Sequence, residues 1–222
     1  MLPLSFKTLA SHAPVILFLG AHSDDIEIGC TGTVMNLADQ LPEARVHWVV
    51  FSALGARESE ARASAAELLA PLKESSVETY GFKDGYFPQA MSDIKDHFEA
   101  LKQRIKPDII FTHERNDLHQ DHRIINELTW NTFRDHLVLE YEIPKYDGGL
   151  GNPNFFINVA QDKVQRKCEH LMKHFATQSN HHWFTADLFS GLMRLRGVEC
   201  RSNSGFAEAF YSRKATFHWD GV

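Results

Sequence analysis

Short apolar runs alternate with amphipathic segments along the first half of the chain. The runs are rich in Val, Ile, Leu and Phe and occupy residues 15–19, 46–51, 77–80 and 109–111. Segments with helical spacing of apolar residues, such as 61–69 and 94–105, lie between them. This alternation predicts an α/β fold with a doubly wound, mostly parallel sheet and helices on both faces. The first and fourth runs are almost continuously apolar, so we expect them to be central strands.

The pattern is weaker in the last third of the chain. Further strands and helices are predicted there at 137–143, 155–160, 164–175 and 186–195. Residues 145–153 are rich in Gly, Asp, Asn and Pro, which indicates a loop. A chain of 222 residues fits one hydrophobic core. We therefore expect a single domain over 1–222, with its core at about 14–210.

Two polar clusters follow the predicted central strands. The first strand runs into His22-Ser23-Asp24-Asp25, and the fourth runs into residues 112–122, which include the sequence His119-Gln120-Asp121-His122. Ligands of open α/β sheets bind beyond the carboxyl ends of the strands. Because adjacent parallel strands end at the same edge of the sheet, we expect the two clusters to lie together.

Three of these side chains form a ligand set for a catalytic zinc ion. Such an ion takes three protein ligands from histidines and carboxylates and leaves a fourth position to water. His22, Asp25 and His122 supply that set. The ligand types would also accept another divalent ion such as Fe²⁺. Each residue alone could be an ordinary loop histidine or helix cap, but two complementary clusters together favour a metal site.

The remaining polar residues of the clusters suit amide hydrolysis. Asp24 lies beside a metal ligand and could act as the general base for a water molecule. His119 could stabilise the oxyanion of a tetrahedral intermediate, or protonate the leaving amine. Asp121 could accept a hydrogen bond that orients an imidazole. Together with the ligand set, these three residues predict a metal-dependent amidase.

The two clusters resemble the signatures of a known family. The segment 22–25 is similar to the motif AHPDD, and 119–122 is similar to HxDH, of the LmbE-like, or PIG-L-type, N-deacetylases. The resemblance covers residues 14 to about 210. It implies a Rossmann-like fold and zinc-dependent deacetylation of N-acetylglucosamine conjugates, including glycolipids and low-molecular-weight thiol precursors. Ser23 replaces the usual proline, which removes a constraint on φ but no ligand.

The resemblance implies the same three zinc ligands and the same general base. It also implies that His119 stabilises the transition state with support from Asp121. Arg57 with Glu60 resembles an RxxE motif, and Asp84 resembles an acidic residue that holds sugar hydroxyl groups, so both are candidate substrate-binding residues. Arg57 could equally pair with Glu60 on a solvated helix face. The segments 141–144 and 207–210 also resemble the family, without a chemical role.

Several other histidines have alternative explanations. His113 follows the fourth strand and could be a substitute ligand, a supporting residue or a structural residue. His170 and His174 have the four-residue spacing of many zinc pairs but lack the glutamate of HExxH, so we expect surface or packing roles. Residues 181–184 could form a pocket lid or an oligomer contact, or pack in the ordinary way.

Composition and charge narrow the function further. The formal net charge is −6 and no run of Lys or Arg occurs, which disfavours a nucleic-acid partner and favours a small-molecule substrate. No apolar stretch reaches the roughly 20 residues of a membrane-spanning helix. Residues 1–11 lack the pattern of a secretory signal, so we expect a cytoplasmic protein. A homo-oligomer is compatible with the sequence.

Together these observations predict a zinc-dependent hydrolase of carbohydrate metabolism. The expected reaction removes the N-acetyl group from an N-acetylglucosamine-type amino sugar or its conjugate. One alternative is a metal-dependent amidase that removes a larger acyl group. Another is a sugar-binding module without turnover, which would need neither Asp24 nor His119.

Overall fold

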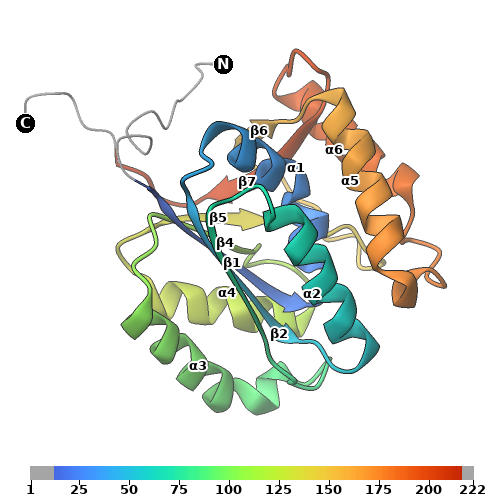
Figure 1. The fold of residues 1–222 in the computed structure, drawn as a ribbon. Helices are drawn as coiled ribbons and strands as arrows, with labels where there is room; N and C mark the ends of the chain where they lie inside the picture. Colours follow the sequence, from blue (N-terminus) through green and yellow to red (C-terminus); the bar gives the residue numbers. More distant parts are fainter. Residues whose placement is uncertain (1–12, 217–222) are drawn as a thin grey trace, which may run out of the picture.

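The computed structural model describes residues 13–216, which form a single α/β domain around one mixed sheet (Figure 1). The seven strands have the order β3-β2-β1-β4-β5-β7-β6. Their bounds are β1 (Val15–His22), β2 (Arg45–Ser52), β3 (Glu74–Thr79), β4 (Ile109–His113), β5 (Leu137–Tyr141), β6 (Phe155–Asn158) and β7 (Ala207–Ser212). The ends of the predicted domain, 1–12 and 217–222, and the segment considered for a secretory signal lie outside the described residues.

The sheet is mostly parallel, as the sequence predicts. Strands β1 to β5 pair in parallel, whereas β7 runs antiparallel to both of its neighbours, β5 and β6. Strands β1 and β4 are adjacent in the middle of the sheet and are buried along their whole length. The two nearly continuous apolar runs are therefore the central strands, as expected.

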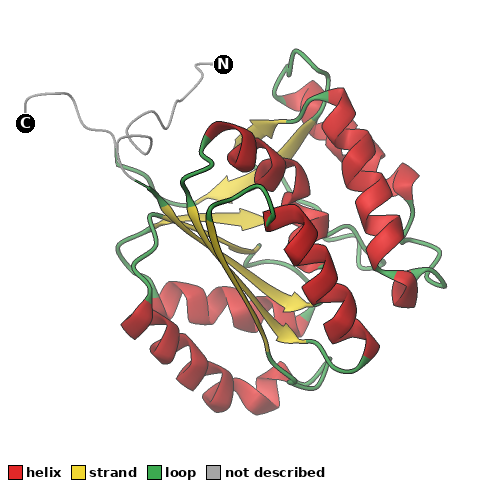
Figure 2. Ribbon diagram, in the orientation of Figure 1, coloured by secondary structure: helices red, strands yellow, loops and turns green. Residues whose placement is uncertain are grey.

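Helices cover both faces of the sheet (Figure 2). They are α1 (Asp25–Gln40), α2 (Ala56–Leu69), α3 (Met91–Arg104), α4 (Gln120–Thr132), α5 (Gln161–His174) and α6 (Ala186–Glu199), with short 3₁₀ helices η2 (Phe87–Ala90) and η3 (Ala176–Gln178). Alternate residues of β1 face opposite layers. Phe18 belongs to a hydrophobic cluster that includes residues of α1, α2, α5 and α6, whereas Leu17 belongs to a second cluster with residues of α3 and α4. No helix within 13–216 is long and apolar enough to span a membrane.

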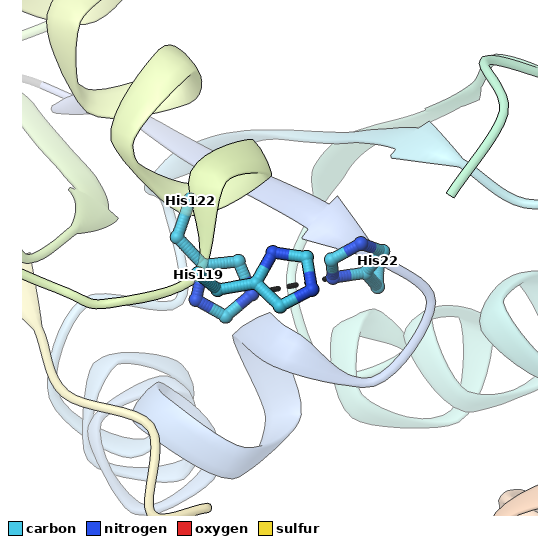
Figure 3. Close-up of side chains that lie close together, drawn as sticks. All are labelled: His22, His119 and His122. Carbon is cyan, nitrogen blue, oxygen red and sulfur yellow. Dashed lines mark hydrogen bonds between the residues drawn. The ribbon is translucent and has the colours of Figure 1, made fainter. Parts of the chain in front are cut away.

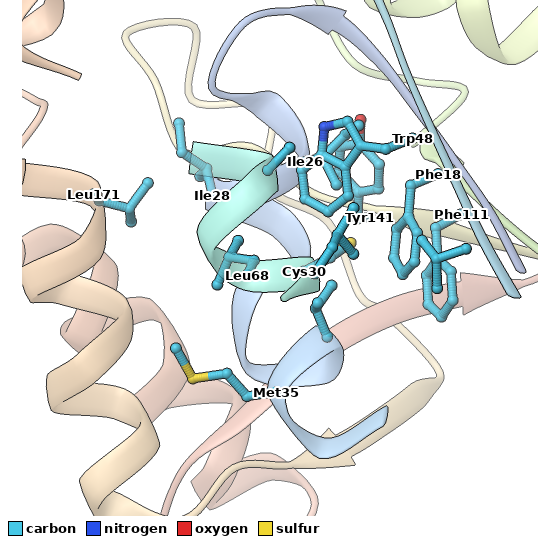
Figure 4. Packing of buried hydrophobic residues seen from close by; sticks show 14 of the residues in the cluster. Phe18, Ile26, Ile28, Cys30, Met35, Trp48, Leu68, Phe111, Tyr141 and Leu171 are labelled. Carbon is cyan, nitrogen blue, oxygen red and sulfur yellow. The ribbon is translucent and has the colours of Figure 1, made fainter. Parts of the chain in front are cut away.

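The core under α1 is closely packed around aromatic rings (Figure 4). Phe18 stacks on Phe111 with ring centroids 4.6 Å apart, and Trp48 lies 5.5 Å from Phe18. Helix α1 approaches β5 closely, since a Cβ atom added to Gly29 would lie 2.5 Å from Cδ2 of Tyr141. The hydroxyl of Tyr141 donates to the Leu19 carbonyl across the sheet (2.7 Å). Tyr141 thus joins β5 to β1 through its hydroxyl and lies against α1 at Gly29 through its ring.

We expect Gly29→Ala to lower the free energy of unfolding by about 1–3 kcal/mol, because the added methyl group overpacks the contact with Tyr141. Gly191 in α6 gives a matched control, since a Cβ atom there would meet nothing within 4 Å. Gly191→Ala should stabilise the protein by up to about 1 kcal/mol through helix propensity. Urea denaturation of both variants measures the difference, and equal effects would contradict the packing explanation.

Buried charges fasten the helices to the C-terminal strands. Glu208 of β7 accepts hydrogen bonds from the backbone N–H groups of Gly32 (2.8 Å) and Thr33 (2.7 Å) in α1. Lys167 of α5 donates to the same carboxylate (2.6 Å) and to the Ile28 carbonyl (2.6 Å). One carboxylate thus joins α1, α5 and β7, which gives the segment 207–210 a structural role.

A second buried ion pair gives the segment 141–144 a structural role. Glu142 follows β5 and pairs with the Arg196 guanidinium of α6 through two contacts of 2.7 Å. Arg196 also donates to the Gly151 carbonyl (3.1 Å) in the loop after β5. This pair anchors that loop to α6.

Candidate functional site

The two polar clusters meet at the carboxyl ends of β1 and β4 (Figure 3). His22 ends β1 and is followed at once by α1, while His113 ends β4 and α4 begins at Gln120. Parallel pairing of β1 with β4 brings both helix starts to one edge of the sheet. His22, His119 and His122 consequently face one another although about a hundred residues separate the clusters.

Three buried side chains form a small triangle of possible ligand atoms. His22 Nδ1 lies 3.2 Å from His122 Nε2 and 3.3 Å from Asp25 Oδ2, and His122 Nε2 lies 3.5 Å from Asp25 Oδ1. A tetrahedral zinc ion with bonds of about 2.0–2.1 Å keeps its ligand atoms about 3.3 Å apart. The backbone N–H of His22 also donates to Asp25 Oδ2 (2.6 Å) and holds that carboxylate in place. The two histidine nitrogens therefore have the spacing of two ligands of such an ion, and Asp25 approaches each of them with a different oxygen. The groups whose ligand atoms all lie within 4.8 Å, one atom per residue, are His22 with His119 and His122, and Asp25 with His113 and His122.

The outer nitrogen of each histidine in the triangle faces a carboxylate. His22 Nε2 lies 3.1 Å from Asp84 Oδ1 and 3.2 Å from Asp121 Oδ2, and His122 Nδ1 lies 2.9 Å from Asp117 Oδ2. Metal-binding histidines commonly donate their second N–H to such a partner, which fixes the tautomer and the ring orientation. These contacts direct His22 Nδ1 and His122 Nε2 towards each other.

Asp24 lies next to the triangle in the chain and is also buried. Burial and the neighbouring Asp25 raise the pKa of Asp24 to about 6, while Arg57 and His22 act in the opposite direction. Arg57 Nη2 is 3.8 Å from Asp24 Oδ1. Asp24 is thus a buried acidic group that forms an ion pair with Arg57 just before α1.

His119 caps the start of α4 and borders the triangle. Its ring centroid lies 4.9 Å from that of His22 and 4.6 Å from that of His122. His119 Nδ1 accepts a hydrogen bond from the backbone N–H of Asp121 (3.2 Å), so the neutral ring has its proton on Nε2. Burial and the nearby His22 lower the pKa of His119. The side chain is therefore a neutral donor that is only partly covered.

The carboxylate of Asp121 orients His22, whereas its contact with His119 is made through its backbone N–H. Its two oxygens accept hydrogen bonds from the backbone N–H groups of Gly85 (2.6 Å) and Phe87 (3.1 Å). Asp121 thus holds the loop after β3 against the site. The resemblance implied that Asp121 supports His119, whereas its carboxylate faces His22 Nε2.

Arg57 and Asp84 come together at the edge of the site. Arg57 Nη1 donates to Asp84 Oδ2 (2.9 Å), and Arg57 Nε donates to Ser23 Oγ (3.1 Å). Asp84 is half exposed, so it is accessible from solvent. Glu60, which the sequence offered as a partner for Arg57, instead accepts hydrogen bonds from Thr177. The arginine therefore belongs to the site and not to a solvated helix pair.

Asp117 and Lys145 were not identified from the sequence. Asp117 Oδ2 accepts from Lys145 Nζ (2.6 Å) as well as facing His122, and the two partners together lower the pKa of Asp117 despite its burial. Lys145 comes from the loop after β5, and the next residue, Tyr146, contacts His182 Nδ1 through its hydroxyl (3.0 Å). The loop at 145–153 thus links residues 181–184 to the site. Only the position of Asp117 inside the polar cluster hinted at its role.

His113 lies behind the triangle. Its ring stacks on that of His122 with centroids 3.9 Å apart, and its Nε2 lies 2.9 Å from the backbone nitrogen of Ala21 and 3.2 Å from Asp25 Oδ2. Tyr141 also approaches this nitrogen (3.2 Å). Because these contacts surround Nε2, we interpret His113 as a support for the triangle.

Comparisons with known proteins bear on these residues. Residues 17–133 match the family model for PIG-L, described as GlcNAc-PI de-N-acetylase, and this range includes both polar clusters. No match was found among curated proteins.

Solved structures of similar fold include enzymes of more than one activity. N,N'-diacetylchitobiose deacetylase from Pyrococcus horikoshii has a TM-score of 0.67 and 16% identity, over 93% of this chain and 86% of that chain. GalB, the 4-carboxy-2-hydroxymuconate hydratase from Pseudomonas putida KT2440, has a TM-score of 0.67 and 17% identity, over 94% and 100%. The zinc-inhibited form of the teicoplanin deacetylase Orf2 has a TM-score of 0.67 and 13% identity, over 89% and 97%. At such identities the similarity is one of fold.

Proposed function

The chain belongs to the PIG-L family of GlcNAc-PI de-N-acetylases, and from this premise we propose that it hydrolyses the N-acetyl group of an N-acetylglucosamine-type amino sugar or its conjugate. The observation that supports this most directly is the buried triangle of His22, Asp25 and His122, with Asp24 and His119 beside it. A sugar-binding module would require the ligands at most, and not the neighbouring base and donor.

The triangle would hold one divalent ion, and zinc is the ion that we propose. When bound, such an ion lowers the pKa of a water molecule towards about 7 and polarises the substrate carbonyl. Asp117, Asp121 and Asp84 hold the two imidazoles in the orientation that binding needs. Because the teicoplanin deacetylase is described in a zinc-inhibited form, Fe²⁺ and other divalent ions belong in the test.

The chain's own residues then move protons and stabilise charge. Asp24 takes a proton from the attacking water as the new C–O bond forms. His119 directs its Nε2–H at the developing oxyanion, and the backbone N–H of Asp121 maintains the tautomer that this needs. The proton held by Asp24 passes to the leaving nitrogen as the C–N bond breaks. The products are acetate and the free amine.

Arg57 and Asp84 are proposed to bind the sugar. Asp84 is half exposed, and its two oxygens are held by Arg57 and His22, so the carboxylate is aligned to accept hydrogen bonds from sugar hydroxyl groups. The same arginine contacts Ser23 and approaches Asp24. Substrate binding and the proposed base are therefore connected through one guanidinium group.

The proposal is tested by the release of free amine from a panel of N-acetylglucosamine conjugates. The panel also contains the same sugars with longer N-acyl groups, and the protein is assayed after chelation and after reloading with Zn²⁺, Fe²⁺ or Co²⁺. We expect release of acetate that chelation abolishes and at least one ion restores. A preference for longer acyl groups would favour a different amidase, and a protein that binds metal but releases nothing would favour a sugar-binding module.

Asp117→Asn should weaken metal binding by about 10–100-fold, because the amide no longer offers a charged acceptor to His122 Nδ1 and Lys145. Titration with a competing chelator measures the affinity. Asp147→Asn in the exposed loop after β5 is the matched control and should bind metal as the wild type does. Equal affinities in all three proteins would contradict the orienting role of Asp117.

A further inference from the structure

A second group of possible ligands joins α2 to α5, apart from the triangle. His170 and His174 lie one turn apart on α5, and Glu67 faces them from the last turn of α2. Each of the three can present one ligand atom so that all lie within 4.8 Å of one another. We propose that Glu67, His170 and His174 bind a second divalent transition-metal ion, of which zinc is the best match.

The carboxylate of Glu67 spans the two imidazole rings. Its Oε2 lies 2.8 Å from His174 Nε2, and its Oε1 lies 3.7 Å from His170 Nδ1. The two ring centroids are 4.3 Å apart. Two imidazoles and one carboxylate are the ligand types of many zinc sites, and a fourth position would remain for water. Helix α5 supplies two of the ligands, and the third, Glu67, comes from the neighbouring helix α2.

The partners of His170 suit the tautomer that a metal ligand needs. Its Nε2 lies 2.8 Å from Ser64 Oγ, and the Ser64 hydroxyl donates its only proton to Glu27 Oε1 (2.5 Å). With the Ser64 proton on Glu27, Ser64 Oγ can accept the proton of His170 Nε2–H, and in that tautomer Nδ1 carries a lone pair. That lone pair faces Glu67 Oε1. Two electron-rich atoms that face each other in this way are stabilised when a cation lies between them.

The supporting residues are buried, so this arrangement is built into the fold. Glu27, Ser64 and His170 are at most 5% exposed, and they come from α1, α2 and α5. Metal-binding histidines commonly have such a hydrogen-bonded partner behind them. An ion bound to Glu67 and the two histidines would therefore fasten α2 to α5 and, through Ser64 and Glu27, to the first turn of α1.

Lys173 competes with this ion for the carboxylate of Glu67. Its Nζ lies 2.6 Å from Glu67 Oε2, the same oxygen that faces His174. The lysine side chain is 61% exposed, and ion pairs at such positions contribute little to stability. A divalent ion can thus displace the ammonium group. Removal of the lysine should make metal binding tighter, whereas loss of a ligand should make it weaker.

The test uses calorimetric titration of the full chain with Zn²⁺, after metal removal. His122→Ala disables the triangle and isolates the second site, where we expect one zinc ion per chain. In the same background, Glu67→Gln and His174→Ala should each weaken binding at least tenfold, and Lys173→Met should strengthen it. His182→Ala, which removes an exposed histidine elsewhere, is the matched control and should change nothing.

A second measurement does not depend on the His122 variant. Wild-type protein should bind two zinc ions per chain, and Glu67→Gln and His174→Ala should each bind one. Co²⁺ in the second site should give the strong visible absorption of a tetrahedral ion. A zinc stoichiometry that neither substitution lowers would overturn the proposal. Neither outcome depends on whether the chain is a deacetylase.

Discussion

Asn in place of Asp24 should lower kcat for the deacetylation by about 10²–10⁴ while the metal content of the protein stays at the wild-type level. The amide has the shape of the carboxylate but cannot accept the proton of the attacking water. Asp24 is buried, with Arg57 as its basic neighbour. Amine release under saturating substrate, together with metal analysis of the same sample, measures both quantities.

Asp25→Asn is the informative comparison. This substitution makes the same chemical change at the adjacent residue, but Asp25 belongs to the ligand triangle. We expect that variant to lose metal affinity as well as activity, so the pair separates the base from the ligand. If Asp24→Asn retained the wild-type kcat, the base would have to be another group.

Glu208→Ala should lower the free energy of unfolding by about 3–5 kcal/mol, which is the usual cost of leaving one partner of a buried ion pair alone. Lys167 would keep its charge at 3% side-chain exposure, and the N–H groups of Gly32 and Thr33 would lose their acceptor. Urea or thermal denaturation measures the change. Because α1 begins with Asp25, partial loss of metal binding should accompany it.

Two further variants test the explanation. Glu169→Ala removes an exposed glutamate from α5 and should change stability by no more than about 0.5 kcal/mol. Replacing Glu208 and Lys167 together by Met leaves neither of these two buried charges without a partner, so the double variant should be more stable than Glu208→Ala. A double variant as unstable as the single one would show that the backbone contacts of Glu208, and not its ion pair, dominate.

The fold by itself does not decide among activities. A hydratase and two deacetylases share the arrangement of strands and helices at the same TM-score of 0.67. The distinction must come from the site, because a fold positions side chains without determining their chemistry. In this chain the family match and the set of His22, Asp24, Asp25, His119 and His122 point to hydrolysis of an amide.

Several features were predictable from local sequence. Periodic apolar runs predicted the parallel sheet, and the almost continuous runs predicted its central strands, because buried parallel strands need apolar residues on both faces. The two clusters were expected to meet, since parallel neighbours end at one edge of a sheet. The parallel pairing of β1 with β4 places them there.

Other features depend on contacts between distant parts of the chain. The antiparallel strand β7 lies between β5 and β6, although it follows both in sequence. Arg57 turns towards Asp84 and not towards Glu60, its neighbour on the same helix. Lys145 reaches Asp117 from a loop whose composition predicted only that it was a loop. No local pattern encodes such pairs.

The sequence alone thus determined the fold class, the edge of the sheet that would contain the site, and the residue types available for metal binding and proton transfer. Those properties follow from the period of apolar residues and from the chemistry of each side chain, which are local. The tertiary structure decided which nitrogen of each histidine in the triangle faces inward and which carboxylate contacts the other nitrogen. It also placed Glu67 beside His170 and His174. Those properties depend on the relative positions of separate helices and loops, which arise only when the whole core packs.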